Sequence, residues 1–153
     1  MVAKPSKGMV TDMAASPDPP LHGGCLCGAV RYELSAEPHD LYHCHCSICR
    51  KCQGALYPAY ASVVRSGFVV TQGADRLSTF DSSAELHRHF CSSCGSHVYG
   101  EMEGDPDTIS FSVGTLDDGA DPGGRQGKER HIFWGSRMGW YEPSDGLPSV
   151  DEF

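Results

Sequence analysis

The sequence contains no long apolar run. Nothing in it approaches the roughly 20 consecutive apolar residues of a membrane-spanning helix. Its opening residues carry lysines at Lys4 and Lys7, but they lack the apolar segment that must follow in a secretory signal. We therefore expect a cytoplasmic protein whose thiols stay reduced.

Positive charge is also scarce. The chain has 12 Lys and Arg residues against 20 Asp and Glu residues, which gives a formal net charge of −8. Because nucleic acid attracts basic surfaces, this balance argues against a nucleic-acid partner. A membrane partner is not expected either, and the composition leaves the oligomeric state open.

Helical periodicity is nearly absent. The 153 residues include 18 glycines and 10 prolines, and only residues 47–53 suggest a helical turn. Short segments bounded by turn residues instead predict strands. These segments are 29–34, 55–63, 68–72, 77–81, 85–90, 97–101 and 109–113. We expect a mainly β protein of antiparallel sheets, formed by residues 21–153, behind a disordered leader at residues 1–20.

Cysteine, by contrast, is abundant and clustered. Seven of the eight cysteines form three clusters, which are Cys25 and Cys27, then Cys44, Cys46 and Cys49, and finally Cys91 and Cys94. Thiolates one or two residues apart can bind the same tetrahedral zinc ion. Disulfides are the weaker interpretation, because Cys-x-Cys is a poor bridge and the expected compartment is reducing. Spacing favours zinc without excluding iron.

The clusters predict two different zinc sites. The first and last clusters would form a closed four-cysteine site of the zinc-ribbon kind and pin residues 28–90 as a loop. The middle cluster would supply three ligands and leave one coordination position for water or substrate, which is the usual layout of catalytic zinc. We therefore expect two Zn²⁺ ions per chain.

Several residues near the middle cluster have alternative interpretations. Cys52 is either a bystander or a fourth ligand that would close the site. His43 and His45 alternate with the cysteines, so they are supporting or surface groups rather than ligands in the favoured interpretation. Arg50 is either part of an exposed basic turn or, as we favour, the group that binds an anionic substrate.

Two further pairs of residues have ordinary structural interpretations. His87 and His89 lie on one face of a candidate strand, where we expect them to face solvent. Trp134 and Trp140 are expected to pack in the core.

Five stretches in the same order resemble the glutathione-dependent formaldehyde-activating enzyme family, also called the centromere-protein-V-like family. They are residues 23–32, 43–51 with 54–55, 90–96, 114–118, and 131–140 with 145–148. The resemblance spans residues 21–150. This chain carries Arg137 and Gly139 where relatives often carry lysine and proline, so we expect no substrate role at that point.

The resemblance implies a fold and a site. The fold is an Mss4-like arrangement of folded-over antiparallel sheets stapled by zinc. By resemblance, the first and last cysteine pairs hold a structural zinc, and Cys44, Cys46 and Cys49 hold the active zinc.

The resemblance also implies an activity. The family's founding reaction condenses formaldehyde with glutathione to S-hydroxymethylglutathione, and in reverse it is a carbon–sulfur lyase reaction. A small thiol or a thiol–aldehyde adduct is then the partner. The alternatives are a non-catalytic zinc-stabilised binding module, and a thiol- or metal-responsive redox protein in which Cys46, Cys49 or Cys52 oxidises reversibly.

Overall fold

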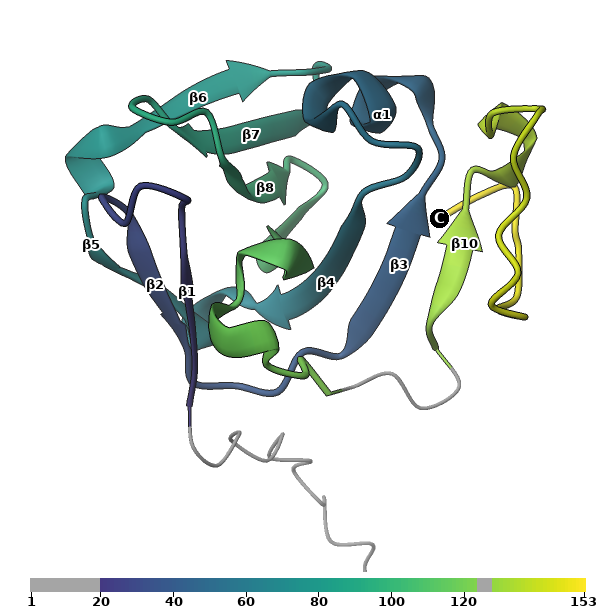
Figure 1. Cartoon of the computed structure of the whole chain (residues 1–153). Coiled ribbons are helices and arrows are strands. Elements are labelled where there is room, and N and C mark those ends of the chain that lie inside the picture. Colours follow the sequence, from purple (N-terminus) through teal and green to yellow (C-terminus); the bar gives the residue numbers. More distant parts are fainter. Residues whose placement is uncertain (1–19, 124–127) are drawn as a thin grey trace, which may run out of the picture.

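The computed structural model describes residues 20–123 and 128–153 (Figure 1). The expected leader lies outside these ranges except for Pro20. The described residues contain one α-helix, α1 (Ser47–Gln53), and short 3-10 turns at Arg65–Gly67, Ala74–Arg76, Val113–Thr115, Asp117–Gly119 and Trp134–Ser136. None of their helices has the length and apolar character needed to cross a membrane.

The smaller of two sheets has three antiparallel strands in the order β1-β2-β5. Its strands are β1 (Leu21–Gly24), β2 (Arg31–Leu34) and β5 (Phe68–Gln72). In β2, Tyr32 and Leu34 are buried, whereas Arg31 and Glu33 are partly exposed. One face of this sheet is therefore turned to the core, as the alternating sequence predicts.

The larger sheet has seven strands in the order β10-β3-β4-β9-β8-β7-β6. They are β3 (Asp40–Cys44), β4 (Ala59–Val64), β6 (Leu77–Asp81), β7 (Leu86–Cys91), β8 (His97–Met102), β9 (Asp105–Ser112) and β10 (Arg130–Ile132). All neighbours are antiparallel except β3 and β10, which are parallel. Figure 1 shows the smaller sheet and the β3–β10 pair at opposite sides of the fold.

The predicted elements agree with this architecture to different degrees. The mainly β, folded-over fold is confirmed, and the bounds predicted for α1, β5 and β6 match the structure. Three strands, β1, β3 and β10, were not predicted. In β3, Leu41 and Tyr42 are consecutive buried residues, so the strand lacks the period of two that marks a half-buried strand.

The buried apolar residues form two clusters. The first joins the two sheets and consists of Cys25, Val30, Tyr32, Leu34, Ala61, Val63, Cys91, Val98, Ile109, Phe111 and Leu116. The second is smaller and consists of Tyr42, Cys44, Cys49, Tyr60 and Ile132. Each cluster contains two cysteines from one of the two predicted zinc sites, so each site is partly anchored in the packed interior.

Candidate metal centres

None of the eight cysteines forms a disulfide in the structure. The first and last cysteine clusters each lie in a tight turn. Gly28 donates its N–H to the Cys25 carbonyl at 3.0 Å, and Gly95 donates to the Cys91 carbonyl at 2.8 Å. Both glycines have a positive φ, near 76° and 77°, which a residue with a Cβ adopts at a cost. The glycines thus let each chain segment turn sharply behind its pair of cysteines.

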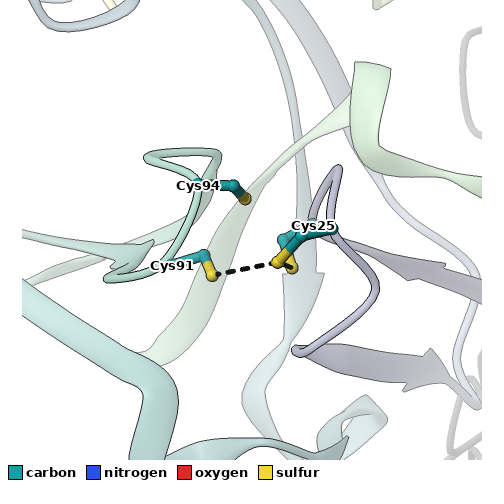
Figure 2. Close-up of side chains that lie close together, drawn as sticks. Cys25, Cys91 and Cys94 are labelled. Carbon is teal, nitrogen blue, oxygen red and sulfur yellow. Dashed lines mark hydrogen bonds between the residues drawn. The ribbon is translucent and has the colours of Figure 1, made fainter.

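The two turns bring Cys25, Cys27, Cys91 and Cys94 together, and their sulfur atoms all lie within 4.8 Å of one another. Figure 2 shows sulfur atoms from the two turns pointing toward one another. The Cys25–Cys27 sulfur separation is 3.5 Å and the Cys27–Cys91 separation is 3.8 Å. Zinc at 2.3 Å from four sulfurs requires separations of about 3.8 Å. The group therefore fits a tetrahedral zinc ion.

Local hydrogen bonds to the sulfur atoms of Cys25 and Cys94 favour the deprotonated thiolates that bind a cation. The Val30 N–H donates to the Cys25 sulfur at 3.2 Å. The Ser96 side chain, 3.3 Å from the Cys94 sulfur, lowers the pKa of Cys94 to about 5. Since metal ligands must be deprotonated, a thiolate at neutral pH favours metal binding.

The middle cluster joins the end of β3 to the start of α1. Cys44 is the last residue of β3, Cys46 is the N-cap of α1, and Cys49 lies in the helix. The Cys49 N–H donates to the Cys46 sulfur at 3.3 Å, so this sulfur takes the place of a capping oxygen. The three sulfur atoms lie within 4.8 Å of one another and could hold a metal ion. We call Cys44, Cys46 and Cys49 the triad.

The triad shares its negative charge unevenly. Hydrogen bonds from Cys44 and Cys49 lower the pKa of Cys46 to about 2, whereas the contacts of Cys44 with Cys46 and Cys49 raise the pKa of Cys44. Without a cation, the second and third protons are therefore hard to remove. A divalent metal ion would remove this penalty, which is why three such close thiols favour metal binding.

Cys52 does not join the triad. It is exposed on α1 and belongs to neither metal-ligand group found among the described residues. Among the described residues, the triad therefore offers three cysteine sulfur atoms to a metal ion and no fourth.

A cavity of about 240 Å³ lies beside the triad, and all three cysteines line it. Most of its wall is apolar, contributed by side chains that include Ile48, Leu86, Met102, Ile132, Phe133 and Phe153. None of the four cysteines of the other group lines it. The triad thus has access to a space that could hold a small molecule.

Arg88 of β7 places a buried positive charge at the cavity wall. Its side chain is 3% exposed and donates hydrogen bonds to the Cys49 sulfur at 3.2 Å, to Tyr60 Oη at 3.1 Å and to Ser82 Oγ at 2.8 Å. Burial opposes its charge, but Cys49 and Tyr60 outweigh burial and raise the pKa of Arg88. No carboxylate of a described residue lies within ion-pair distance of Arg88, so the triad is its anionic partner.

His97 of β8 also lines the cavity. Its Nδ1 atom lies 2.8 Å from Ser112 Oγ and 3.2 Å from the Gln53 amide nitrogen, which is a donor, so we assign the ring proton to Nε2. Nε2 is buried and has no hydrogen-bond partner in the described part of the chain. Burial, aided by Arg88, lowers the pKa of His97 to about 4, so the ring is neutral at pH 7. A residue that lines the cavity thus carries a neutral ring with a buried, unpartnered Nε2 atom.

Arg50 has a different environment from the one we predicted. It does not line the cavity. Its Nε donates to the His45 carbonyl at 3.1 Å, its Nη2 donates to the Ser136 carbonyl at 3.1 Å, and its Nη1 lies 2.8 Å from Met138 Sδ. Arg50 therefore ties the triad loop to the C-terminal segment, and its role in binding an anionic substrate stays a prediction.

The histidines beside the triad face a second, aromatic cluster. His45 is buried, and its Nε2 lies 2.9 Å from His131 Nδ1, whose ring in turn lies 3.1 Å from the Asp145 carboxylate. His43 Nε2 lies 3.0 Å from Glu129. Neither His43 nor His45 belongs to a metal-ligand group. This chain of contacts fixes β3, and hence Cys44, against β10.

Two smaller expectations are corrected by the structure. The side chain of His89 is only 14% exposed and lies 2.7 Å from Glu101, so it does not simply face solvent. Trp140 is 71% exposed and is not a core residue. Trp134 is partly buried, with its ring centroid 5.1 Å from that of His45.

Fold and geometry together define a small β protein with two cysteine centres that could bind metal, one formed by four cysteines and one by three beside a cavity. The chain belongs to the glutathione-dependent formaldehyde-activating enzyme family, whose sequence profile matches residues 20–136. Both the resemblance and the fold predicted from it are thereby confirmed.

Two fungal relatives carry names provisionally assigning them to this enzyme. A protein of Emericella nidulans is 30% identical over 132 residues, which cover 84% of this chain and 67% of that protein. A protein of Fusarium vanettenii is 35% identical over 79 residues, which cover 52% of this chain and 42% of that protein. The match thus spans less than half of the Fusarium protein.

A solved structure is similar as well. The crystal structure of a Rhodobacter sphaeroides protein matches with a TM-score of 0.56 and 26% identity, over 66% of this chain and 91% of that chain. The similarity supports the arrangement of sheets described above.

Proposed function

We propose that this protein is a zinc-dependent enzyme that makes and breaks the carbon–sulfur bond of a thiol–aldehyde adduct, of which S-hydroxymethylglutathione is the family example. The observation that carries the proposal is the triad itself, whose three cysteines line a cavity and are not joined by Cys52. Family membership supports formaldehyde and glutathione as reactants. We propose a cytoplasmic location on the sequence evidence alone.

We assign two zinc ions to the two groups. Cys25, Cys27, Cys91 and Cys94 would hold a structural ion, since four ligands leave no position for a substrate. The triad would hold the reactive ion, which would lower the pKa of a bound thiol and present it as a thiolate.

Charge balance supports delivery of a thiolate at the triad. Three thiolates and one Zn²⁺ carry a formal charge of −1, which by itself would repel an incoming thiolate. The Arg88 guanidinium, 3.2 Å from the Cys49 sulfur, offsets that charge. We therefore assign Arg88 as a positioning residue that keeps the triad able to accept an anion.

His97 is the proposed hydrogen-bond donor to the aldehyde oxygen. In the condensing direction the thiolate sulfur attacks the carbonyl carbon, the carbon–sulfur bond forms, and the electron pair of the C=O π bond moves to oxygen. The buried Nε2–H of His97, which lacks a partner, could donate to that oxygen as its charge grows. The proton that completes the hydroxyl group comes from solvent.

The test is exchange-resolved NMR of formaldehyde, glutathione and their adduct at equilibrium, with and without the zinc-loaded protein. This method separates catalysis from the spontaneous reaction. We expect faster exchange with the protein and loss of that acceleration in Cys46→Ser. An unaccelerated exchange, with both zinc ions bound, would refute the enzymatic proposal and favour the zinc-stabilised binding module.

A redox role would be detected differently. Peroxide would then release zinc and lower the count of free thiols reversibly, with recovery after a reductant is added.

A further inference from the structure

We propose that the cavity beside the triad binds an apolar substituent of the adduct, so that the preferred reactants include an aldehyde or thiol more apolar than formaldehyde and glutathione. The inference rests on the proposed function, because the triad is taken as the place where the adduct forms. It concerns what the cavity recognises rather than the bond that the triad makes or breaks.

The wall of the cavity favours such a substituent. Leu86 and Met102 come from β7 and β8, and Ile48 comes from α1. Ile132 is the last residue of β10, and Phe133 follows it. Phe153 closes one side, with its ring centroid 4.9 Å from that of Tyr42. Apolar surface removed from water in such a space contributes about 25 cal/mol per Å².

The charges of the cavity fit glutathione poorly. Glutathione carries a carboxylate at each end, whereas Arg88 is the only lysine or arginine among the lining residues described. All three Arg88 nitrogens already donate to protein groups, and Glu85, also at the wall, would repel a carboxylate. A carboxylate without a partner is costly in apolar surroundings. The peptide ends of glutathione therefore lie outside the cavity.

The size of the cavity also favours an apolar substituent larger than a single carbon. Formaldehyde adds a single carbon to the thiol sulfur and would leave most of the roughly 240 Å³ unfilled. An apolar cavity of about 150 Å³ is sufficient to hold a benzene ring. A phenyl, benzyl or butyl group attached to the reacting carbon or to the reacting sulfur would fill the space.

The experiment compares two series of reactants with the zinc-loaded full chain. In one series glutathione reacts with formaldehyde, acetaldehyde, butanal or phenylacetaldehyde. In the other, formaldehyde reacts with glutathione, 2-mercaptoethanol or benzyl mercaptan. We expect the catalysed rate constant, relative to the spontaneous one, to rise about fourfold per buried methylene group in the series whose substituent enters the cavity. Equal or falling ratios in both series would overturn the inference.

A binding measurement separates this inference from the proposed function. Calorimetry would compare benzyl mercaptan with glutathione, without any aldehyde present. Tighter binding of benzyl mercaptan, with no pair accelerated, would leave the apolar site standing and refute the catalytic proposal. Tighter binding of glutathione would overturn the inference even if the formaldehyde reaction were accelerated.

A matched pair of variants locates the effect. Met102 and Val64 are both 42% exposed strand residues, but only Met102 lines the cavity. Met102→Lys should reduce the preference for the apolar reactant at least tenfold, because the ammonium group brings water into the space. Val64→Lys should leave the preference unchanged. Equal effects of the two variants would refute the assignment to the cavity.

Discussion

The two cysteine groups use the same ligand chemistry in different surroundings. The group of Cys25, Cys27, Cys91 and Cys94 joins two distant turns, includes residues of the core between the sheets, and does not line the cavity. The triad is local in sequence, has three members, and lies beside both a cavity and the buried Arg88. Cysteine number and the residues around the cysteines, rather than ligand type, therefore distinguish the proposed structural centre from the proposed reactive one.

The largest expected effect comes from opening the closed group. Cys91 is fully buried and joins two distant parts of the chain, so Cys91→Ser should abolish folding. The lost binding free energy of a structural zinc is on the order of 10 kcal/mol. Circular dichroism and thermal unfolding would measure the loss of folding, and metal analysis would measure the loss of zinc.

The control for this change is Cys52→Ser, which alters an exposed thiol outside both groups. It should retain both zinc ions and change the free energy of unfolding by less than about 0.5 kcal/mol. A Cys91→Ser protein that unfolds cooperatively at the temperature of this control would contradict the structural assignment.

Removing one ligand of the triad should have a local effect. We expect Cys46→Ser to fold, to lose one zinc ion of the two and to lose the catalysed exchange. The reason is that the four-cysteine group and the core between the sheets are left intact. Metal analysis together with the melting curve would test this. An unchanged zinc content would remove the triad as a metal site.

The buried cation tests whether the surroundings of the triad matter. Arg88→Met keeps the length of the stem but removes three hydrogen bonds and the charge that offsets the thiolates. We expect a 10- to 100-fold loss in second-site zinc affinity or catalysed exchange, as is typical for residues that support metal ligands. Arg88→Lys should recover part of the lost zinc affinity and catalysed exchange. If the methionine and lysine variants behave alike, charge is not the cause.

The smallest expected effect is a pH dependence of stability. The pKa of His97 is about 4 in the folded chain, below its ordinary value of 6.5. The unfolded chain therefore takes up the proton first, and stability falls as pH drops from about 6.5 toward 4. At pH 5 the loss is about 2 kcal/mol.

Urea unfolding at several pH values would measure this loss, with His97→Gln as the comparison. The variant should show a shallower fall below pH 6.5 than the parent protein. Identical slopes would show that other groups cause the dependence.

Local sequence features determined a large part of this protein. Residues one to three apart along the chain must lie close in space, so the triad, its place at the start of α1 and its suitability for a metal could be predicted. Turn residues on both sides fixed the bounds of β5 and β6. The pairing of the first and last cysteine clusters was also predicted, and the structure brings the four cysteines together.

Other parts of the site had no local signal. Arg88 and His97 were not predicted as site residues. Arg88 stands between two histidines in a strand, where alternation alone would have marked it as facing the opposite side from His87 and His89. His97 is a single histidine at the start of β8.

The cavity, the Arg88–Cys49 contact and the His45–His131 contact were decided only by the tertiary structure. The first contact joins residues 39 positions apart, and the second joins residues 86 positions apart. Such contacts depend on which strands become neighbours. β10, which pairs with β3 in parallel, has only three residues, too few to show a period of two in the sequence. The sequence alone therefore determined which cysteines could bind a metal, because the closely spaced thiols of each cluster must lie near one another. The surroundings that would make one centre reactive depend on long-range packing, which short-range patterns do not encode.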